Sequence, residues 1–121
     1  MSNIQDLNQA TRDAVTLTAE NISRIVRDLP FKAKLALRGL LGIQQGSLAV
    51  TLPDGRKVLI RGEAAGPNAA LTLRNWNLPD RALTSGTIGI AETYMDGDWD
   101  SPDITAFLEL FLVNGEAAYS Y

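Results

Sequence analysis

The sequence predicts an α+β domain with two N-terminal helices, a small, largely antiparallel sheet, a short helix and a C-terminal helix. Three observations predict this class. Apolar residues recur at helical spacing up to residue 41, alternate with polar residues from Gly46 onward, and return to helical spacing after Asp103. Helices and strands that are segregated along the chain in this way are typical of α+β domains.

The first 41 residues are predicted to form two helices. Residues 4–29 place most of their apolar side chains on one side, and Leu17 is the one large apolar residue outside that side. Pro30 ends or kinks this helix because proline disfavours helical geometry at the preceding residue. Residues 31–41 are apolar on more than one side, which predicts a helix packed between partners or lying at a membrane interface.

A β-hairpin is predicted next. Leu48, Val50 and Leu52 alternate with the smaller residues Ser47, Ala49 and Thr51. Pro53-Asp54-Gly55 is a turn signal, and Lys57 to Arg61 returns as the second strand. Residues 63–68 are predicted to form a loop, and Ala70 to Trp76 a third strand.

The C-terminal part is predicted to hold a short helix, a strand and a final helix. Asn77 is expected to cap a short helix with Pro79 and Asp80 in its first turn, ending at Ser85-Gly86. Ile88 and Ile90 suggest a fourth strand, and residues 94–100 a turn that leads to a brief strand or loop. Ser101-Pro102-Asp103 then starts a helix that Asn114-Gly115 stops. Its helically spaced apolar positions are Ile104, Phe107, Leu108, Phe111 and Leu112.

We therefore expect a helical segment over residues 1–42, an α+β domain over residues 43–115 and a tail or linker over residues 116–121.

The chain has neither cysteine nor histidine. That excludes disulfides and thiolate nucleophiles and removes the commonest general base, so catalysis within these residues is disfavoured. No apolar run approaches the roughly 20 residues that span a bilayer, and the polar N-terminus is unlike a secretory signal. A cytoplasmic location is expected, with peripheral contact at the inner membrane surface as a further hypothesis.

The net charge of −3 is unevenly distributed. Residues 1–61 carry nine Lys/Arg and five Asp/Glu, a balance of +4, whereas residues 62–121 carry two and nine, a balance of −7. Basic side chains that flank apolar ones favour an anionic phospholipid surface. An ordinary solvated surface over a packed core explains them equally well, and nucleic acid is disfavoured by the acidic total and the lack of an aromatic stacking platform. The candidate contact residues are Arg24, Arg27, Phe31, Lys32, Lys34, Leu35 and Arg38.

Five acids lie close together near the C-terminal helix, at Glu92, Asp96, Asp98, Asp100 and Asp103. Their spacing imitates the start of a calcium loop, but the match fails where glycine and a bidentate glutamate are required. We expect these acids to cap helices and to pair with Arg61, Arg74 or Arg81, and we expect no metal site. No phosphate-binding glycine loop is present either, so no S-adenosylmethionine or nucleotide site is predicted in this chain.

Three segments resemble the N-terminal domain of cyclopropane-fatty-acyl-phospholipid synthases. Residues 46–56 resemble the opening hairpin of that domain, and residues 65–74 its next strand. Residues 89–103 are similar to the family signature G-x-x-E-x-Y-M-x-G-x-W-x-x-x-D. The signature places Glu92, Tyr94, Met95, Gly97, Trp99 and Asp103 at the family positions. The likeness covers about residues 43–115, whereas the first 40 residues match only in being helical and amphipathic.

The resemblance implies a non-catalytic domain. Members of the family methylenate phospholipid acyl chains with S-adenosylmethionine in a separate C-terminal methyltransferase domain, and their N-terminal domain is thought to help lipid binding and dimer formation. The order of elements is also similar to the sterol-carrier-protein fold. The sequence contains no counterpart of the methyltransferase domain or its cysteine, so no catalytic residue is carried over. Gly97 and Trp99 are expected to be structural, whereas Glu92, on an otherwise apolar strand, needs a partner or faces the absent domain.

Three functions therefore stay open. The first is a lipid-engaging N-terminal domain of a synthase-like methyltransferase, whose partners are a phospholipid surface and a methyltransferase domain in cis or in trans. The second is a docking or dimerisation module without lipid contact, whose partner could be a second copy of this chain. The third is a free-standing lipid carrier with an internal cavity.

Overall fold

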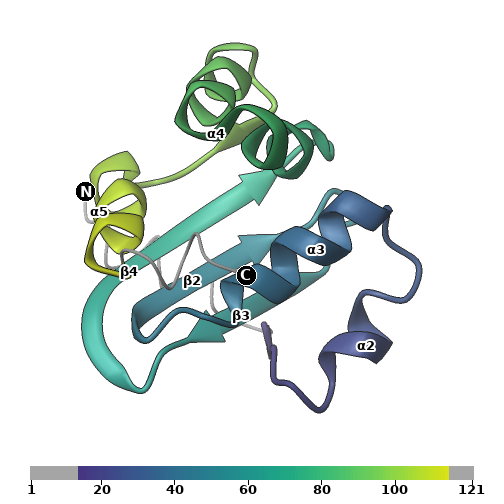
Figure 1. Cartoon of the computed structure of the whole chain (residues 1–121), viewed down its shortest axis with the longest axis vertical. Helices are drawn as coiled ribbons and strands as arrows, with labels where there is room; N and C mark the ends of the chain where they lie inside the picture. Colours follow the sequence, from purple (N-terminus) through teal and green to yellow (C-terminus); the bar gives the residue numbers. More distant parts are fainter. Residues whose placement is uncertain (1–13, 115–121) are drawn as a thin grey trace.

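The computed structural model describes residues 14–114, which form a mixed five-stranded sheet with three helices on one face (Figure 1). The strands are β1 (Val15–Thr16), β2 (Gln45–Thr51), β3 (Lys57–Arg61), β4 (Ala64–Leu73) and β5 (Trp99–Asp100). The helices are α2 (Ile22–Ile25), α3 (Phe31–Leu40), α4 (Asn77–Met95) and α5 (Ile104–Asn114). The α+β class is confirmed.

The sheet has the strand order β1-β3-β2-β4-β5. The pairs β2/β3 and β4/β5 are antiparallel, whereas β1/β3 and β2/β4 are parallel. The sheet is therefore mixed rather than largely antiparallel, because the chain crosses over to place β4 beside β2 instead of continuing as a meander.

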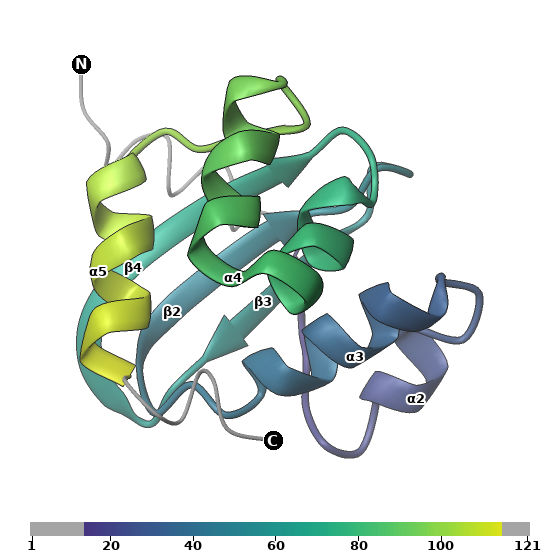
Figure 2. The ribbon, with the colours of Figure 1, turned by 45° about the horizontal axis from the view of Figure 1, so that its top comes forward.

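The apolar face of the sheet is covered by α3, α4 and α5 (Figure 2). Leu48 and Val50 of β2 lie beside Ala69 and Leu71 of β4, and all four belong to the main hydrophobic cluster. The same cluster contains Ile22, Val26, Leu29, Ala33 and Leu37. Side chains from before and after residue 43 thus share one core. The other face of the sheet carries a small cluster of Ala49, Leu59 and Ala70.

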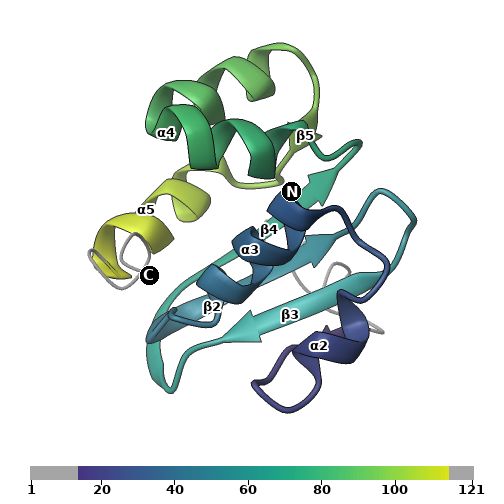
Figure 3. The same cartoon turned by 45° about the vertical axis from the view of Figure 1, so that its right-hand side comes forward.

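Of the predicted helix over residues 4–29, only the turn of α2 is helical among the described residues, and residues 4–13 lie outside them. Val15 and Thr16 pair with Val58 and Leu59 of β3, as suits β-branched side chains. Thr18 and Asn21 then exchange side-chain hydrogen bonds of 2.9 and 3.1 Å with each other's backbone N–H, which forms a turn. Leu17, outside the predicted apolar side, is buried, and only the single turn of α2 beside the β3 edge is helical (Figure 3).

The predicted loop over residues 63–68 is also wrong, because most of it belongs to β4. Gln45 pairs with Ala64 and Ser47 with Asn68, so the register shifts between them and leaves residues 65–67 in a bulge. Pro67 is tolerated there because a bulged residue need not donate to the ladder. Gly46 opposite has a φ of 82°, and a Cβ at this position would overlap the carbonyl oxygen of Pro67.

The predicted strand at Ile88 and Ile90 is wrong, because both residues belong to the second half of α4. The first half ends at Gly86 as predicted, where the backbone (φ 57°, ψ −135°) is not helical. The predicted cap at Asn77 is wrong, because Asn77 is the first residue of α4 and its side chain donates a hydrogen bond to Asp98 instead. The chain turns at Gly86 and resumes as a helix, so Ile90 packs against the core from a helix and Ile88 is exposed.

The hairpin, the 31–41 helix and the brief strand at Trp99 are confirmed, and the final helix starts after Ser101-Pro102-Asp103, with Asp103 as its cap. Within α5 the apolar side is rotated from the prediction, since Phe107 and Leu110 are buried whereas Leu108 and Leu112 are exposed. Asn114 ends the helix, and its side-chain oxygen accepts hydrogen bonds from the N–H groups of Gln44 and Gln45 at 2.7 and 3.0 Å.

Leu110 is 0% exposed, so replacing it by alanine leaves a cavity in the main core. We expect Leu110→Ala to lower the free energy of unfolding by about 2–5 kcal/mol. The matched variant Leu112→Ala, on the same helix but 77% exposed, is expected to change it by no more than about 0.5 kcal/mol. Urea unfolding followed by circular dichroism measures both, and equal losses in the two variants would contradict this packing of α5.

Candidate functional site

The predicted lipid-contact residues are divided among three places on the surface. Phe31, Lys34, Leu35 and Arg38 have i, i+3, i+4, i+7 spacing and share the side of α3 that faces away from the core. Phe31 is 71% and Leu35 42% exposed. We call these four residues the outer α3 face. The predicted presence of apolar groups on two sides of this helix is therefore confirmed, with Ala33 and Leu37 turned inward.

The other three residues do not join this face. The ammonium group of Lys32 pairs with Asp80 of α4 at 2.6 Å, which links the two helices. Arg24 lines a surface groove beside Arg56, and Arg27 is exposed in the turn after α2.

The outer α3 face carries two positive charges, of Lys34 and Arg38, that form no ion pair with an acid of residues 14–114. Arg38 donates a long 3.4 Å hydrogen bond to the Ser23 hydroxyl. Arg56 differs, because it pairs with Asp54 and Asp28. Its hydrogen bond to the Asp54 carboxylate lowers the pKa of that carboxyl.

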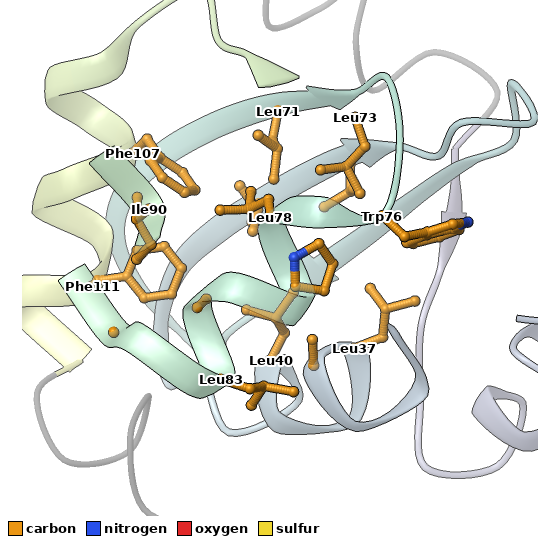
Figure 4. Close-up of a pocket in the computed structure, with 16 residues that line it drawn as sticks. Leu37, Leu40, Leu71, Leu73, Trp76, Leu78, Leu83, Ile90, Phe107 and Phe111 are labelled. Atoms are coloured by element: carbon orange, nitrogen blue, oxygen red, sulfur yellow. The ribbon is translucent and has the colours of Figure 1, made fainter. Parts of the chain in front are cut away.

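An apolar pocket of about 170 Å³ lies between the helices and the sheet (Figure 4). Its floor is made by buried leucine and valine side chains of β2 and β4, and its sides by α3, α4 and α5. Leu40, Leu83, Gly86 and Phe111 are at least partly exposed, so they form the rim. The complete lining is Ala36, Leu37, Leu40, Leu48, Val50, Leu71, Leu73, Trp76, Leu78, Pro79, Ala82, Leu83, Gly86, Ile90, Phe107 and Phe111.

The kink of α4 shapes this pocket, because both halves of the helix border it. Gly89 of the second half lies against the backbone of Arg81 in the first, where a Cβ would overlap the Arg81 carbonyl. The Arg81 guanidinium also pairs with Glu92 across the kink. Glu92 therefore lies on a helix rather than a strand and has a partner within the chain.

Two signature residues, Tyr94 and Trp99, form an aromatic group with Phe107 beside the pocket. The Trp99 ring is 2% exposed and lies 5.0 Å from the Tyr94 ring and 5.1 Å from the Phe107 ring, between centroids. Its indole N–H donates a 3.0 Å hydrogen bond to the Thr93 hydroxyl. Trp99 thereby ties β5 and the second half of α4 to Phe107, which lines the pocket.

The remaining signature residues serve the turn and the next helix. Gly97 has a φ of 82°, which glycine adopts without strain. The Asp103 carboxylate accepts a 3.0 Å hydrogen bond from the N–H of Ala106 and so caps α5. Met95 is 77% exposed and has no evident structural task.

Two other acids of the cluster, Asp98 and Asp100, hold the same region together through their side chains. Asp98 accepts hydrogen bonds from the side chains of Asn75 and Asn77 at 2.9 and 3.2 Å, and Asp100 lies 3.9 Å from Arg74. Over the described range, no three potential metal-ligating side chains converge.

Neither the pocket nor the role of Thr93 was predicted from the sequence, whereas the pairing of Arg81 with an acid of the cluster was expected and is confirmed. The lining comes from five separate elements, so no local pattern could have assembled it. Thr93 follows Gly89 by one helical turn, so its hydroxyl can reach the Gly89 carbonyl. The spacing indicates this contact only if residues 87–95 are known to form a helix, and they were predicted to contain a strand.

Within the described residues, none of the helices has the length and apolar character that crossing a bilayer requires. Comparisons with protein-family models, with curated proteins and with solved structures found no match.

The hydrogen bond between Trp99 and Thr93 is expected to hold the aromatic group in place. Thr93→Val leaves the buried indole N–H without an acceptor, so we expect the free energy of unfolding to fall by about 1–3 kcal/mol. Thr93→Ser keeps the hydroxyl and is expected to cost less. Urea unfolding followed by tryptophan fluorescence compares them, and an equal loss for serine and valine would show that the hydrogen bond has no such role.

Proposed function

We propose that this chain is a non-catalytic, lipid-engaging N-terminal domain of a cyclopropane-fatty-acyl-phospholipid synthase-like methyltransferase. Its task is to contact an anionic phospholipid surface, peripherally and in the cytoplasm, for a methyltransferase domain in cis or in trans. The observation that carries the proposal is the outer α3 face. The signature at residues 89–103 supports the assignment to this family of enzymes.

The exposure of Phe31 and Leu35 supports membrane contact. A large apolar side chain that stays in water at 71% exposure gains free energy when it enters the interface of a bilayer. Two such side chains one helical turn apart can enter together, because they project from the same side of α3.

The charges beside them support an anionic surface. Each basic residue near such a surface contributes about 1 kcal/mol. Lys34 and Arg38 can make this contribution in full, because neither forms an ion pair with an acid of residues 14–114 that membrane binding would have to break. Lys32 adds less, since its ammonium group is already paired with Asp80.

The proposal predicts salt-sensitive binding to anionic vesicles. Co-sedimentation with phosphatidylglycerol vesicles is expected at low salt, to weaken at high salt, and to be absent with phosphatidylcholine vesicles. Arg38→Glu reverses one charge on the outer α3 face and is expected to weaken binding roughly tenfold or more. The matched control Arg61→Glu, an exposed arginine of β3, makes the same change in net charge elsewhere.

A chain that stays in the supernatant with both vesicle types would contradict the proposal and favour the docking or dimerisation module. Equal losses for Arg38→Glu and Arg61→Glu would show that net charge, and not the outer α3 face, attracts the chain.

The apolar contribution is tested separately with Phe31. Phe31→Ala is expected to weaken binding to anionic vesicles at high salt, where charge contributes least, by roughly tenfold. Leu112→Ala, with a similarly exposed side chain on α5, is expected to leave binding unchanged. Retention of full binding by Phe31→Ala would contradict insertion of the outer α3 face.

A further inference from the structure

The pocket between α3, α4, α5 and the sheet is lined almost entirely by hydrocarbon. Every lining side chain is apolar except Trp76, whose indole nitrogen points away from the other lining side chains (Figure 4). A polar group buried here would lose its hydrogen bonds to water without replacement, at a cost of roughly 2–7 kcal/mol. The chemistry of the lining therefore selects an uncharged apolar segment.

The volume of the pocket limits how much of a ligand can enter. At about 170 Å³ the pocket is close to an engineered apolar cavity of about 150 Å³ that stays dry and binds benzene, a six-carbon ligand. Ordinary sites for larger molecules occupy roughly 300–1,000 Å³. A whole acyl chain or a sterol is therefore too large for the pocket as it stands.

The opening of the pocket leaves room for the rest of a longer molecule outside. The floor side chains Leu48 and Leu71 are buried, whereas Leu83 and Gly86 at the rim are exposed. A ligand can therefore place one end against the sheet and keep its other end in solvent.

We propose that this pocket binds the terminal segment, about six carbons long, of a straight hydrocarbon chain and leaves the polar end of that molecule outside. This inference deepens the proposed function, since lipids supply such chains, but it rests on different residues from the outer α3 face. Free fatty acids and phospholipids share this chemistry, and the experiment distinguishes them.

A series of 1-alkanols from butanol to dodecanol, titrated against the chain and followed by amide chemical shifts in NMR spectra, tests the proposal. Affinity is expected to rise about fourfold with each added methylene and to level off once about six carbons are buried. The largest shifts are expected at Leu73, Leu78 and Phe107. Affinity that rises without limit through dodecanol, or shifts confined to other residues, would overturn the proposal.

Two short amphiphiles identify the source of the chain. Octanoate and dihexanoyl phosphatidylcholine are titrated in the same way, below the concentrations at which each forms micelles. The proposal requires at least one of them to shift the same pocket residues, and the tighter of the two identifies the source. Failure of both would overturn it.

Filling the pocket separates it from general surface binding. Ala82→Phe places a ring in the pocket and is expected to reduce alkanol affinity at least tenfold. Ala91→Phe adds the same ring at an exposed position of the same helix and is expected to leave affinity unchanged. If Ala82→Phe fails to fold, Ala36→Phe fills the pocket from α3. Undiminished affinity in a folded filled variant would overturn the proposal.

Vesicle binding distinguishes this inference from the proposed function. A chain that sediments with anionic vesicles but binds neither alkanols nor the short amphiphiles would overturn the pocket and leave the outer α3 face standing. A chain that binds alkanols but no vesicles would overturn the lipid-surface role of the outer α3 face and leave the pocket standing.

Discussion

Leu48 and Val50 of β2 lie in parallel register beside Ala69 and Leu71 of β4, and together they form an apolar sheet face that must be shielded from water. One helix that precedes these strands and two that follow them provide the cover. This constraint determines the direction of every helix face, because each of α3, α4 and α5 turns its apolar residues toward the same surface. The hairpin partner β3 extends the same face, since Val58 and Ile60 belong to the same hydrophobic cluster.

The way in which the helices cover the sheet creates both candidate sites. Gly86 and the close approach of Gly89 to Arg81 fold α4 back on itself, so its two halves surround the sheet face without filling the space above it. The remaining space is the pocket. On α3, inward packing of Ala33 and Leu37 leaves Phe31 and Leu35 on the opposite side, in water. One helix therefore contributes to the core and to the outer α3 face, and Lys32 fastens it to α4 through Asp80.

Sequence patterns predicted the parts of this arrangement that depend on near neighbours. The hairpin was predictable because Pro53-Asp54-Gly55 connects strands that adjoin in sequence, and α3 because its apolar spacing and Pro30 are local signals. Val15 and Thr16 were misassigned because their strand exists only through pairing with β3, and Ile88 because the turn at Gly86 permits a second helical half. The exposed side of α3 was predictable from its apolar spacing. That Lys32 does not belong to the outer α3 face was not predictable, because it depends on an ion pair with Asp80, far along the chain. The pocket was not predictable because its lining spans residues 36 to 111.

We propose that the outer α3 face is the part of the molecule that meets lipid, and paramagnetic broadening of NMR signals tests this proposal most directly. The chain is added to small anionic bicelles that contain a phospholipid spin-labelled in its headgroup region, and the loss of amide signal is recorded residue by residue. We expect the strongest broadening at Phe31, Leu35 and Arg38, and little at Leu108 and Leu112 of α5. Broadening centred on α5 or on the exposed residues of α4, with α3 unaffected, would contradict the proposal.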